Sequence, residues 1–383
     1  MVKILTKLVR APRIAAEVAD VVKPPKLVKV ADAVAASPSL AKLLDEATGS
    51  GAMSAIQSAP KNEEVALAAI TTYEEAFKFA HPTLRKQDAF AKKAALANPL
   101  LLMPELQDEY AAKAIDAVLP AARREKLLAD PDVAKAVTAL KAKFAQVPDL
   151  NPAIVNNRRL LATLIENRVD LKGKDSRPLA VVVYPKDDWN GQFFASTGDL
   201  APLTKRYRVM FYQVGSDTEF VNAIKSGTER KPAELVFVGG HGEATLAAFG
   251  ADDPARLPEA LRAKLSSVND ADRAEAFEAL TKIDEDKFLD FSDTDILAPL
   301  KARFAKGADL VLMSCSTGKG GPGGDKAKPN NLANYLHELF PQVRVHAPTE
   351  PVQNSGLIVD DNGKFARAGF ANIGKAYVVE PEK

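Results

Sequence analysis

The sequence predicts two domains: an all-helical domain over residues 1–150, and an α/β domain over residues 151–383 with a mostly parallel sheet and helices on both faces. Two observations support this. The first part is rich in Ala, Leu, Lys and Glu, with apolar residues three and four positions apart, as in amphipathic helices. From Arg177 onward, short apolar runs alternate with helical segments, which indicates parallel strands joined by helices.

Composition supports a globular protein and excludes several classes. The chain has 383 residues, 46% of them hydrophobic and 26% charged, which is ordinary for globular domains and is enough length for two of them. A net charge of +1 gives no reason to expect a nucleic-acid partner. No run of about 18 apolar residues is present, so we expect no membrane span. The single cysteine excludes an intrachain disulfide and fits a reducing compartment.

The first residues are the one stretch to test as a targeting sequence. Lys3, Lys7, Arg10 and Arg13 precede the first acid, Glu17. No continuous apolar segment or small-residue cleavage site follows them, so an ordinary helix is favoured over a presequence or a membrane-surface helix. We therefore expect a cytoplasmic protein.

Helix starts in the first part share a pattern in which a capping residue precedes a proline. Ser37-Pro38, Asn98-Pro99 and Asp130-Pro131 each place a good N-cap before a proline at the first helical position. The spacing of these prolines fits either a degenerate array of helical hairpins or an irregular bundle. The expected helices include Val65–Ala80, Glu109–Leu119 and Asp132–Phe144.

A linker rich in Pro, Asp and Asn, Gln146–Pro152, is expected to end the helical domain. A bridging helix over Val155–Asn167 follows it. The strands expected in the α/β domain are Pro178–Tyr184, Tyr207–Val214, Glu234–His241, Asp309–Cys315, Gln342–His346, Gly356–Val359 and Ala376–Val379. The helices expected between them are Asp217–Lys225, Ser292–Lys306 and Asn331–Phe340.

Two of these strands end on residues that can perform catalysis. One leads to His241-Gly242 and the other to Cys315, the only cysteine. Since sites form beyond the carboxyl ends of parallel strands, these residues are expected to be neighbours. The imidazole can take the thiol proton to create a nucleophilic thiolate and later protonate a leaving amine. The N–H groups of Gly242 and Cys315 could together stabilise an oxyanion.

Each of these two residues also has a structural interpretation. A lone cysteine at the end of an apolar strand is more often a small buried hydrophobic residue, and a lone histidine before glycine is more often a turn residue. Their occurrence together at equivalent strand ends brings the catalytic hypothesis level with the structural one.

From about Pro178 to the C-terminus, the chain resembles the caspase-like (clan CD) cysteine peptidases, in which one apolar strand ends in His-Gly and a later one in the nucleophilic Cys. It is most similar to the CHAT branch, whose run "aDLVvLSACeTGkG" corresponds here to Ala308–Gly320; the lead-in Phe291–Ile296 also fits. The resemblance implies that His241 is general base and acid, Cys315 the nucleophile and Gly242 part of the oxyanion hole. The helical part matches only in general character.

The sequence departs from the family pattern near the nucleophile. Met313 stands two residues before Cys315, where relatives specific for basic residues often place an acid, and this weakens the case for basic specificity. The substrate pocket could include Met313, Asp187 and Asp188, although the two acids, like the neighbouring Lys186, are more often solvated loop charges.

Other motifs give no cofactor or metal site. Gly318–Gly323 contains GxGxxG, but no helix opens at its last glycine, so we expect no dinucleotide cofactor. No HExxH or CxxC pattern exists, and a structural role is favoured for His346 over a place at the active-site rim. Residues 318–330 are expected to form a mobile loop that covers substrate, is cleaved at a lysine during activation, or simply connects two elements.

The leading hypothesis is therefore a cysteine endopeptidase that acts on protein substrates, with the helical domain controlling access or binding a regulatory protein. The alternative is a catalytically inactive caspase-like module that binds proteins, because a fold does not imply an activity.

Overall fold

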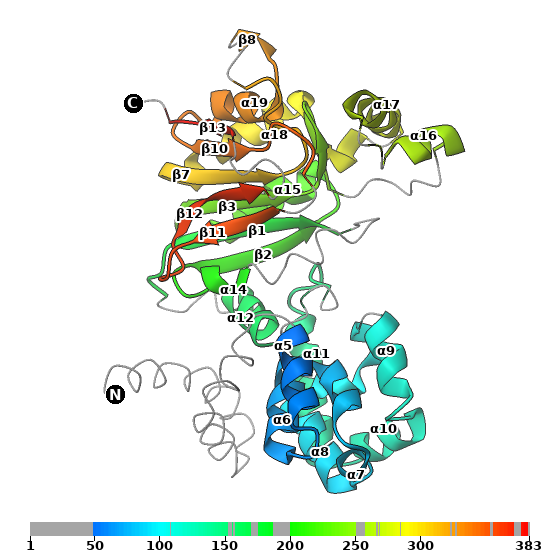
Figure 1. Ribbon diagram of the computed structural model, residues 1–383. Helices are drawn as coiled ribbons and strands as arrows, with labels where there is room; N and C mark the ends of the chain where they lie inside the picture. Colours follow the sequence, from blue (N-terminus) through cyan, green and yellow to red (C-terminus); the bar gives the residue numbers. More distant parts are fainter. Residues whose placement is uncertain are drawn as a thin grey trace. The chain divides into compact units, whose positions relative to one another are not determined.

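The computed structural model describes residues 49–107, 109–151, 155, 158–169, 175–186, 200–249, 257–265, 267, 269–283, 285–321, 324–325, 328–352, 355–370 and 377–381 (Figure 1). The described chain divides into two compact units. The first comprises the chain up to Ala145 together with Asn156–Arg159, and the second comprises Gln146–Val155 and the chain from Leu160. Residues 146–150 thus belong with the second unit and not with the helical one, because Asp149 binds Arg168 through two bonds of 2.6 and 2.8 Å.

Every element described in residues 49–145 is a helix. These helices are α5 (Gly49–Ser58), α6 (Glu63–Thr72), η1 (Glu74–Phe79), α7 (Pro82–Arg85), α8 (Asp88–Ala97), η2 (Pro99–Leu102), η3 (Pro104–Leu106), α9 (Glu109–Asp116), α10 (Ala121–Leu128) and α11 (Pro131–Phe144). The Asn98 and Asp130 side chains accept N–H groups of the turns that they cap, as expected. Ser37-Pro38 lies outside the described residues. The helix expected over Val65–Ala80 is interrupted at Tyr73, whose backbone is extended.

The second unit is built on a mixed, mostly parallel sheet, which confirms the α/β class. Its strands are β1 (Leu179–Pro185), β2 (Arg208–Val214), β3 (Ala233–Gly239), β7 (Phe304–Met313), β10 (Arg344–Ala347) and β13 (Tyr377–Val379). Among the described residues the strand order is β13-β10-β7-β3-β1-β2, and β13 is the antiparallel member. Strands β3 and β7 are neighbours in the middle of the sheet (Figure 1).

Alternate residues of these strands pack on the two faces of the sheet. Leu310 and Leu312 of β7 belong to the main core, which also takes apolar residues from α15 (Asp217–Gly227), η9 (Ala298–Arg303) and α19 (Leu332–Leu339). A hairpin of β11 (Ser355–Val359) and β12 (Phe365–Phe370) lies on the other face, where the Phe365 and His346 rings are 5.2 Å apart.

The edge strand β2 is protected by α12 (Arg158–Val169). A short helix, α14 (Leu200–Leu203), precedes β2 in the chain. The side chains of Asn167 and Arg168 donate to the carbonyl oxygens of Val209 and Phe211, at 2.9 and 3.2 Å. Side chains from one helix therefore satisfy backbone groups that would otherwise be an exposed sheet edge.

A helical insertion, residues 257–283, has its own small core and was not expected from the sequence. It contains α16 (Glu259–Lys264) and α17 (Asp270–Thr281), and it packs on a separate three-stranded antiparallel sheet of β4 (His241–Glu243), β5 (Leu246–Ala248) and β6 (Phe288–Leu289). Figure 1 shows α16 and α17 to one side of the main sheet. The insertion's core comprises Leu246, Ala248, Leu257, Leu265, Ala276, Phe277, Leu280 and Phe288.

The helix expected over Ser292–Lys306 is three short pieces: η8 (Phe291–Asp293), α18 (Thr294–Leu297) and η9. A capping box formed by Asp290 and Asp293 starts the first piece, and Ser292 is not its cap. Burial raises the pKa of Asp293 to about 7, and the neighbouring Asp217 also raises it. The hydrogen bond from the Asp290 N–H lowers this pKa.

Replacing Asp293 with Asn is expected to stabilise the protein more at pH 8 than at pH 5. The folded chain keeps a proton on Asp293 that the unfolded chain, with a pKa near 3.8, has already lost, so the stability that this proton contributes falls as pH rises from about 4 to 7. Asn resembles the protonated acid at every pH. Urea unfolding of both proteins at the two pH values checks this; an equal difference at both would contradict it.

Candidate active site

His241 and Cys315 lie beyond the ends of neighbouring parallel strands. Gly239, the last residue of β3, is paired with Met313, the last residue of β7. His241 and Cys315 each follow two residues later, and both side chains are partly exposed. The structure thus brings the two predicted residues to the same end of the sheet, beyond two adjacent strands, while their catalytic roles stay predictions.

Gly242 packs directly against the backbone that carries Cys315. A methyl group at Gly242 would lie 2.7 Å from Ser314 Cβ and 3.2 Å from the Cys315 carbonyl oxygen. A methyl group at Gly240 would lie 2.5 Å from the Ala248 carbonyl oxygen. The glycines on both sides of His241 therefore allow a close approach of backbones that no other residue type permits.

Cys315 belongs to a tight turn, Ser314–Gly318, which we name the cysteine turn. Ser314, Ser316 and Thr317 are fully buried, whereas Cys315 between them is partly exposed. Ser316 has a φ of +59°, a left-handed conformation that costs a residue with a Cβ about 1–2 kcal/mol. The Thr317 hydroxyl donates to the Ser314 carbonyl at 2.9 Å, which closes the turn. Strain of this kind is common at functional sites, and here it lies directly beside Cys315.

The first turn of α19 ties the two strand ends together. Its Leu332 N–H donates to the carbonyl of Ala244, three residues after His241, at 2.7 Å. The next N–H, of Ala333, donates to the carbonyl of Thr317 in the cysteine turn at 3.0 Å. The first N–H groups of a helix have no acceptor within the helix, so here they are available to fix both segments of the site.

The thiol of Cys315 is held in its protonated form. The Val352 N–H donates to Sγ at 3.5 Å, and the thiol contacts the Val352 carbonyl oxygen at 3.8 Å. Burial raises the pKa of Cys315, and the negative charge of Glu243 raises it further. The Val352 N–H and the positive charge of Arg273 lower this pKa. A base is therefore needed to form the thiolate.

A buried ion pair beside the thiol was missed by sequence reasoning. Arg273 Nε of α17 donates to Glu243 Oε1 of β4 at 2.8 Å, and the two side chains are only 8% and 7% exposed. Glu243 directly follows His241-Gly242, so its place next to this motif could have marked it as a candidate site residue. Arg273 had no such signal, because the insertion that carries it was not predicted.

The residues proposed for a substrate pocket are only partly placed. Met313 is 2% exposed and lies at the end of β7. Asp187 and Asp188 lie outside the described residues. Lys186, just before them, is paired with Glu219 at 2.6 Å. A pocket role for these residues stays a prediction.

The described start of the loop expected over residues 318–330 is a hydrogen-bonded turn, and the mobility of the loop stays a prediction. The Asn331 side chain donates to the carbonyls of Lys319 and Gly321, at 2.9 and 3.2 Å, and Gly318 N–H donates to Pro348. Further along, β8 (Gly324–Asp325) pairs with β9 (Lys328–Pro329). These asparagine bonds satisfy backbone carbonyls that a glycine-rich segment would otherwise expose.

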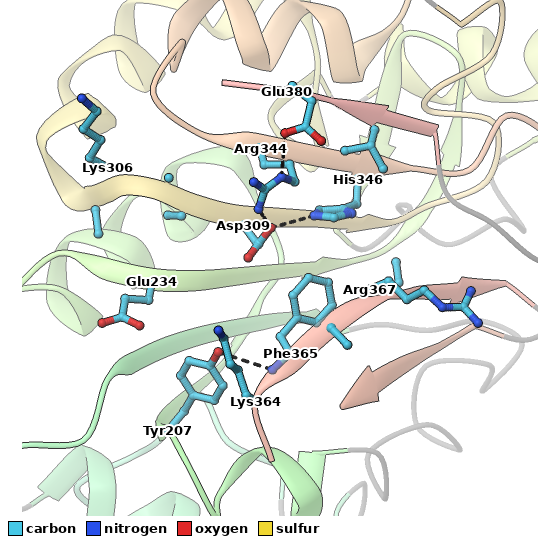
Figure 2. Close-up of a pocket in the computed structure, with 16 residues that line it drawn as sticks. Tyr207, Glu234, Lys306, Asp309, Arg344, His346, Lys364, Phe365, Arg367 and Glu380 are labelled. Atoms are coloured by element: carbon cyan, nitrogen blue, oxygen red, sulfur yellow. Dashed lines mark hydrogen bonds and ion pairs between the residues drawn. The ribbon is translucent and has the colours of Figure 1, made fainter. Parts of the chain in front are cut away.

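A cavity of about 720 Å³ lies away from the thiol, along the first half of β7 (Figure 2). In it, Asp309 Oδ1 accepts from His346 Nε2 at 2.8 Å and from Arg344 Nη1 at 3.0 Å. His346 is paired with Val311, well before Cys315 on β7. The structural role that the sequence favours for His346 stays a prediction.

Within the described residues, no group of three or more His, Cys, Asp or Glu side chains could hold a metal ion. The same part of the chain contains no helix of the length and apolarity that a membrane crossing needs. Comparison with family models, with curated proteins and with solved structures finds no match for this chain.

Proposed function

We propose that this protein is a cysteine endopeptidase of caspase-like fold that cleaves protein substrates with a His241–Cys315 dyad. The observation that supports it most is the placement of both residues at matched positions beyond paired, adjacent parallel strands. The strained cysteine turn adds support, because backbone strain is common at functional sites and Cys315 is partly exposed between buried neighbours. We further propose that the helical unit controls access to the site or binds a regulatory protein, and that the protein acts in the cytoplasm.

In the proposed mechanism, His241 takes the thiol proton and the Cys315 sulfur attacks the scissile carbonyl carbon. The carbonyl π electrons move to the oxygen, and the N–H groups of Gly242 and Cys315 stabilise the resulting oxyanion. The tetrahedral adduct collapses, the C–N bond breaks, and the imidazolium gives its proton to the leaving amine. Water then hydrolyses the thioester with His241 again as base, which returns the thiol and releases the acid.

The alternative, a non-catalytic protein-binding module, is favoured by one observation. The thiol contacts the backbone of Val352, and burial raises the pKa of Cys315, so the resting thiol is a weak nucleophile. An active enzyme must release the thiol from these contacts when substrate binds.

A peptide-library cleavage profile of the full chain tests the proposal. The purified protein is expected to cleave a subset of peptides, and Cys315→Ala and His241→Ala are each expected to abolish that cleavage. Cleavage that survives in both variants would refute the dyad. Absence of cleavage by the unaltered chain would favour the binding module.

A further inference from the structure

The Glu243–Arg273 ion pair joins two parts of the second unit that differ in their role. Glu243 belongs to β4, one residue after the Gly242 that packs on the cysteine turn. Arg273 belongs to the helical insertion, where its Nη1 also donates to the Ser267 carbonyl at 2.7 Å. The insertion therefore holds the guanidinium in place, and the positive charge reaches the site only when α17 is packed on β4.

Stability alone does not explain an ion pair at this position. Both side chains are almost fully buried, so both ions lose most of their hydration. An apolar pair of similar volume is often as stable as a buried ion pair or more so. The remaining positions of the same α17 face are apolar: Ala276, Phe277 and Leu280. A charge in this row is therefore expected to serve the neighbouring site.

Among the described residues, the charged and titratable groups on the segments packed against the cysteine turn include Glu350, whose carbonyl accepts from Ser316 N–H at 3.3 Å, and groups from two elements of the site. His241 and Glu243 lie on β4, and Arg273 lies on α17. Glu243 raises the pKa of Cys315, and Arg273 lowers it. The loop that carries Val352 contributes backbone groups to the sulfur. Removing either charge of the pair thus leaves the opposite charge uncompensated near the thiol.

We propose that the Glu243–Arg273 pair couples the helical insertion to the nucleophile: packing of α17 supplies the positive charge that balances Glu243, and its withdrawal leaves Glu243 to oppose thiolate formation. This inference rests on the proposed function for its biological meaning. Arg273 is a positioning residue in this scheme, because it acts on the thiol through the local charge and not by contact with substrate.

The test is the pH dependence of Cys315 alkylation by iodoacetamide, in which the thiolate displaces iodide and forms a thioether. Cys315 is the only cysteine, so the full chain can be used and the adduct counted by mass. Rates are measured from about pH 6 to 11, a range that spans the ordinary thiol pKa. Glu243→Gln keeps a hydrogen-bond acceptor for Arg273 and is expected to lower the midpoint by about one pH unit. Arg273→Gln is expected to raise it by about the same amount.

The double variant, Glu243→Gln with Arg273→Gln, is expected to return the midpoint to that of the unaltered chain. The matched control is Glu275→Gln, which removes the exposed Lys264–Glu275 pair within the same insertion and is expected to leave the midpoint unchanged. If Arg273→Gln does not fold, Glu243→Gln and the double variant carry the test.

Equal midpoints in the unaltered chain and Glu243→Gln, or shifts of the same sign in both single variants, would overturn the coupling. Alkylation requires only the thiol, so this outcome is separate from that of the cleavage assay. Opposite shifts in a chain that cleaves no peptide would refute the peptidase and uphold the coupling.

Discussion

Replacing Gly242 with Ala is expected to lower cleavage by about 100-fold, because displacement of a catalytic group by about 1 Å can cost that much. The added methyl group would meet Ser314 Cβ at 2.7 Å and the carbonyl oxygens of Leu246 and Cys315 at 3.0 and 3.2 Å. Two of these contacts are backbone atoms that cannot rotate away. The His241 strand and the cysteine turn must therefore separate, at a cost of about 1–3 kcal/mol in the free energy of unfolding.

Cleavage rate and urea unfolding measure these two effects. The matched control is Gly215→Ala, directly after β2, where the new methyl group would meet the flexible side chains of Lys186 and Glu219 at ordinary distances of 3.5 and 3.7 Å. It is expected to retain the cleavage rate and stability. A Gly242→Ala variant with unaltered cleavage would show that close packing of His241's strand on the cysteine turn is not required.

The central strands could be predicted because each is buried on both faces and so appears as a continuous apolar run. Residues 178–184 predict a strand, and β1 is Leu179–Pro185, all of it buried. Helix starts were equally accessible where a side chain caps its own turn, as at Asp130. Both patterns are local, so they can be recognised in the sequence without knowledge of the rest of the fold.

The helical insertion could not be predicted because its core is assembled from distant, short segments. The buried face of α17 runs through Arg273, Ala276, Phe277 and Leu280, so one of its positions is charged and its apolar pattern is incomplete. The partners on this face include Leu246 and Phe288, on strands of only two or three residues. Strands this short are too brief to show the alternation of apolar and polar residues by which a strand is predicted.

The candidate site was accessible from the sequence only in part. His241 and Cys315 end two apolar runs, and parallel strands place such ends at one edge, so the pair followed from pattern and topology. The left-handed backbone of Ser316 had no signal, since that conformation usually requires Gly or Asn. The Glu243–Arg273 pair depends on a long-range contact between β4 and α17, which no local pattern encodes.

The central claim is that His241 activates Cys315. Because burial raises the pKa of Cys315, the thiol is protonated at neutral pH, and attack on a carbonyl requires a base. A general base contributes about 10²–10⁴-fold to such a step. His241 lies at the matching position of the adjacent strand end, where Gly240 and Gly242 hold its backbone against Ala248 and Ser314.

The most direct measurement is the rate at which a peptidyl acyloxymethyl ketone, with its P1 residue taken from the cleavage profile, labels Cys315 at neutral pH. Intact mass is expected to show one adduct on the unaltered chain and none on Cys315→Ala. His241→Ala is expected to react at least ~100-fold more slowly, whereas His81→Ala, a control in the helical unit, is expected to react at the unaltered rate. Labelling of His241→Ala at the unaltered rate would contradict the dyad.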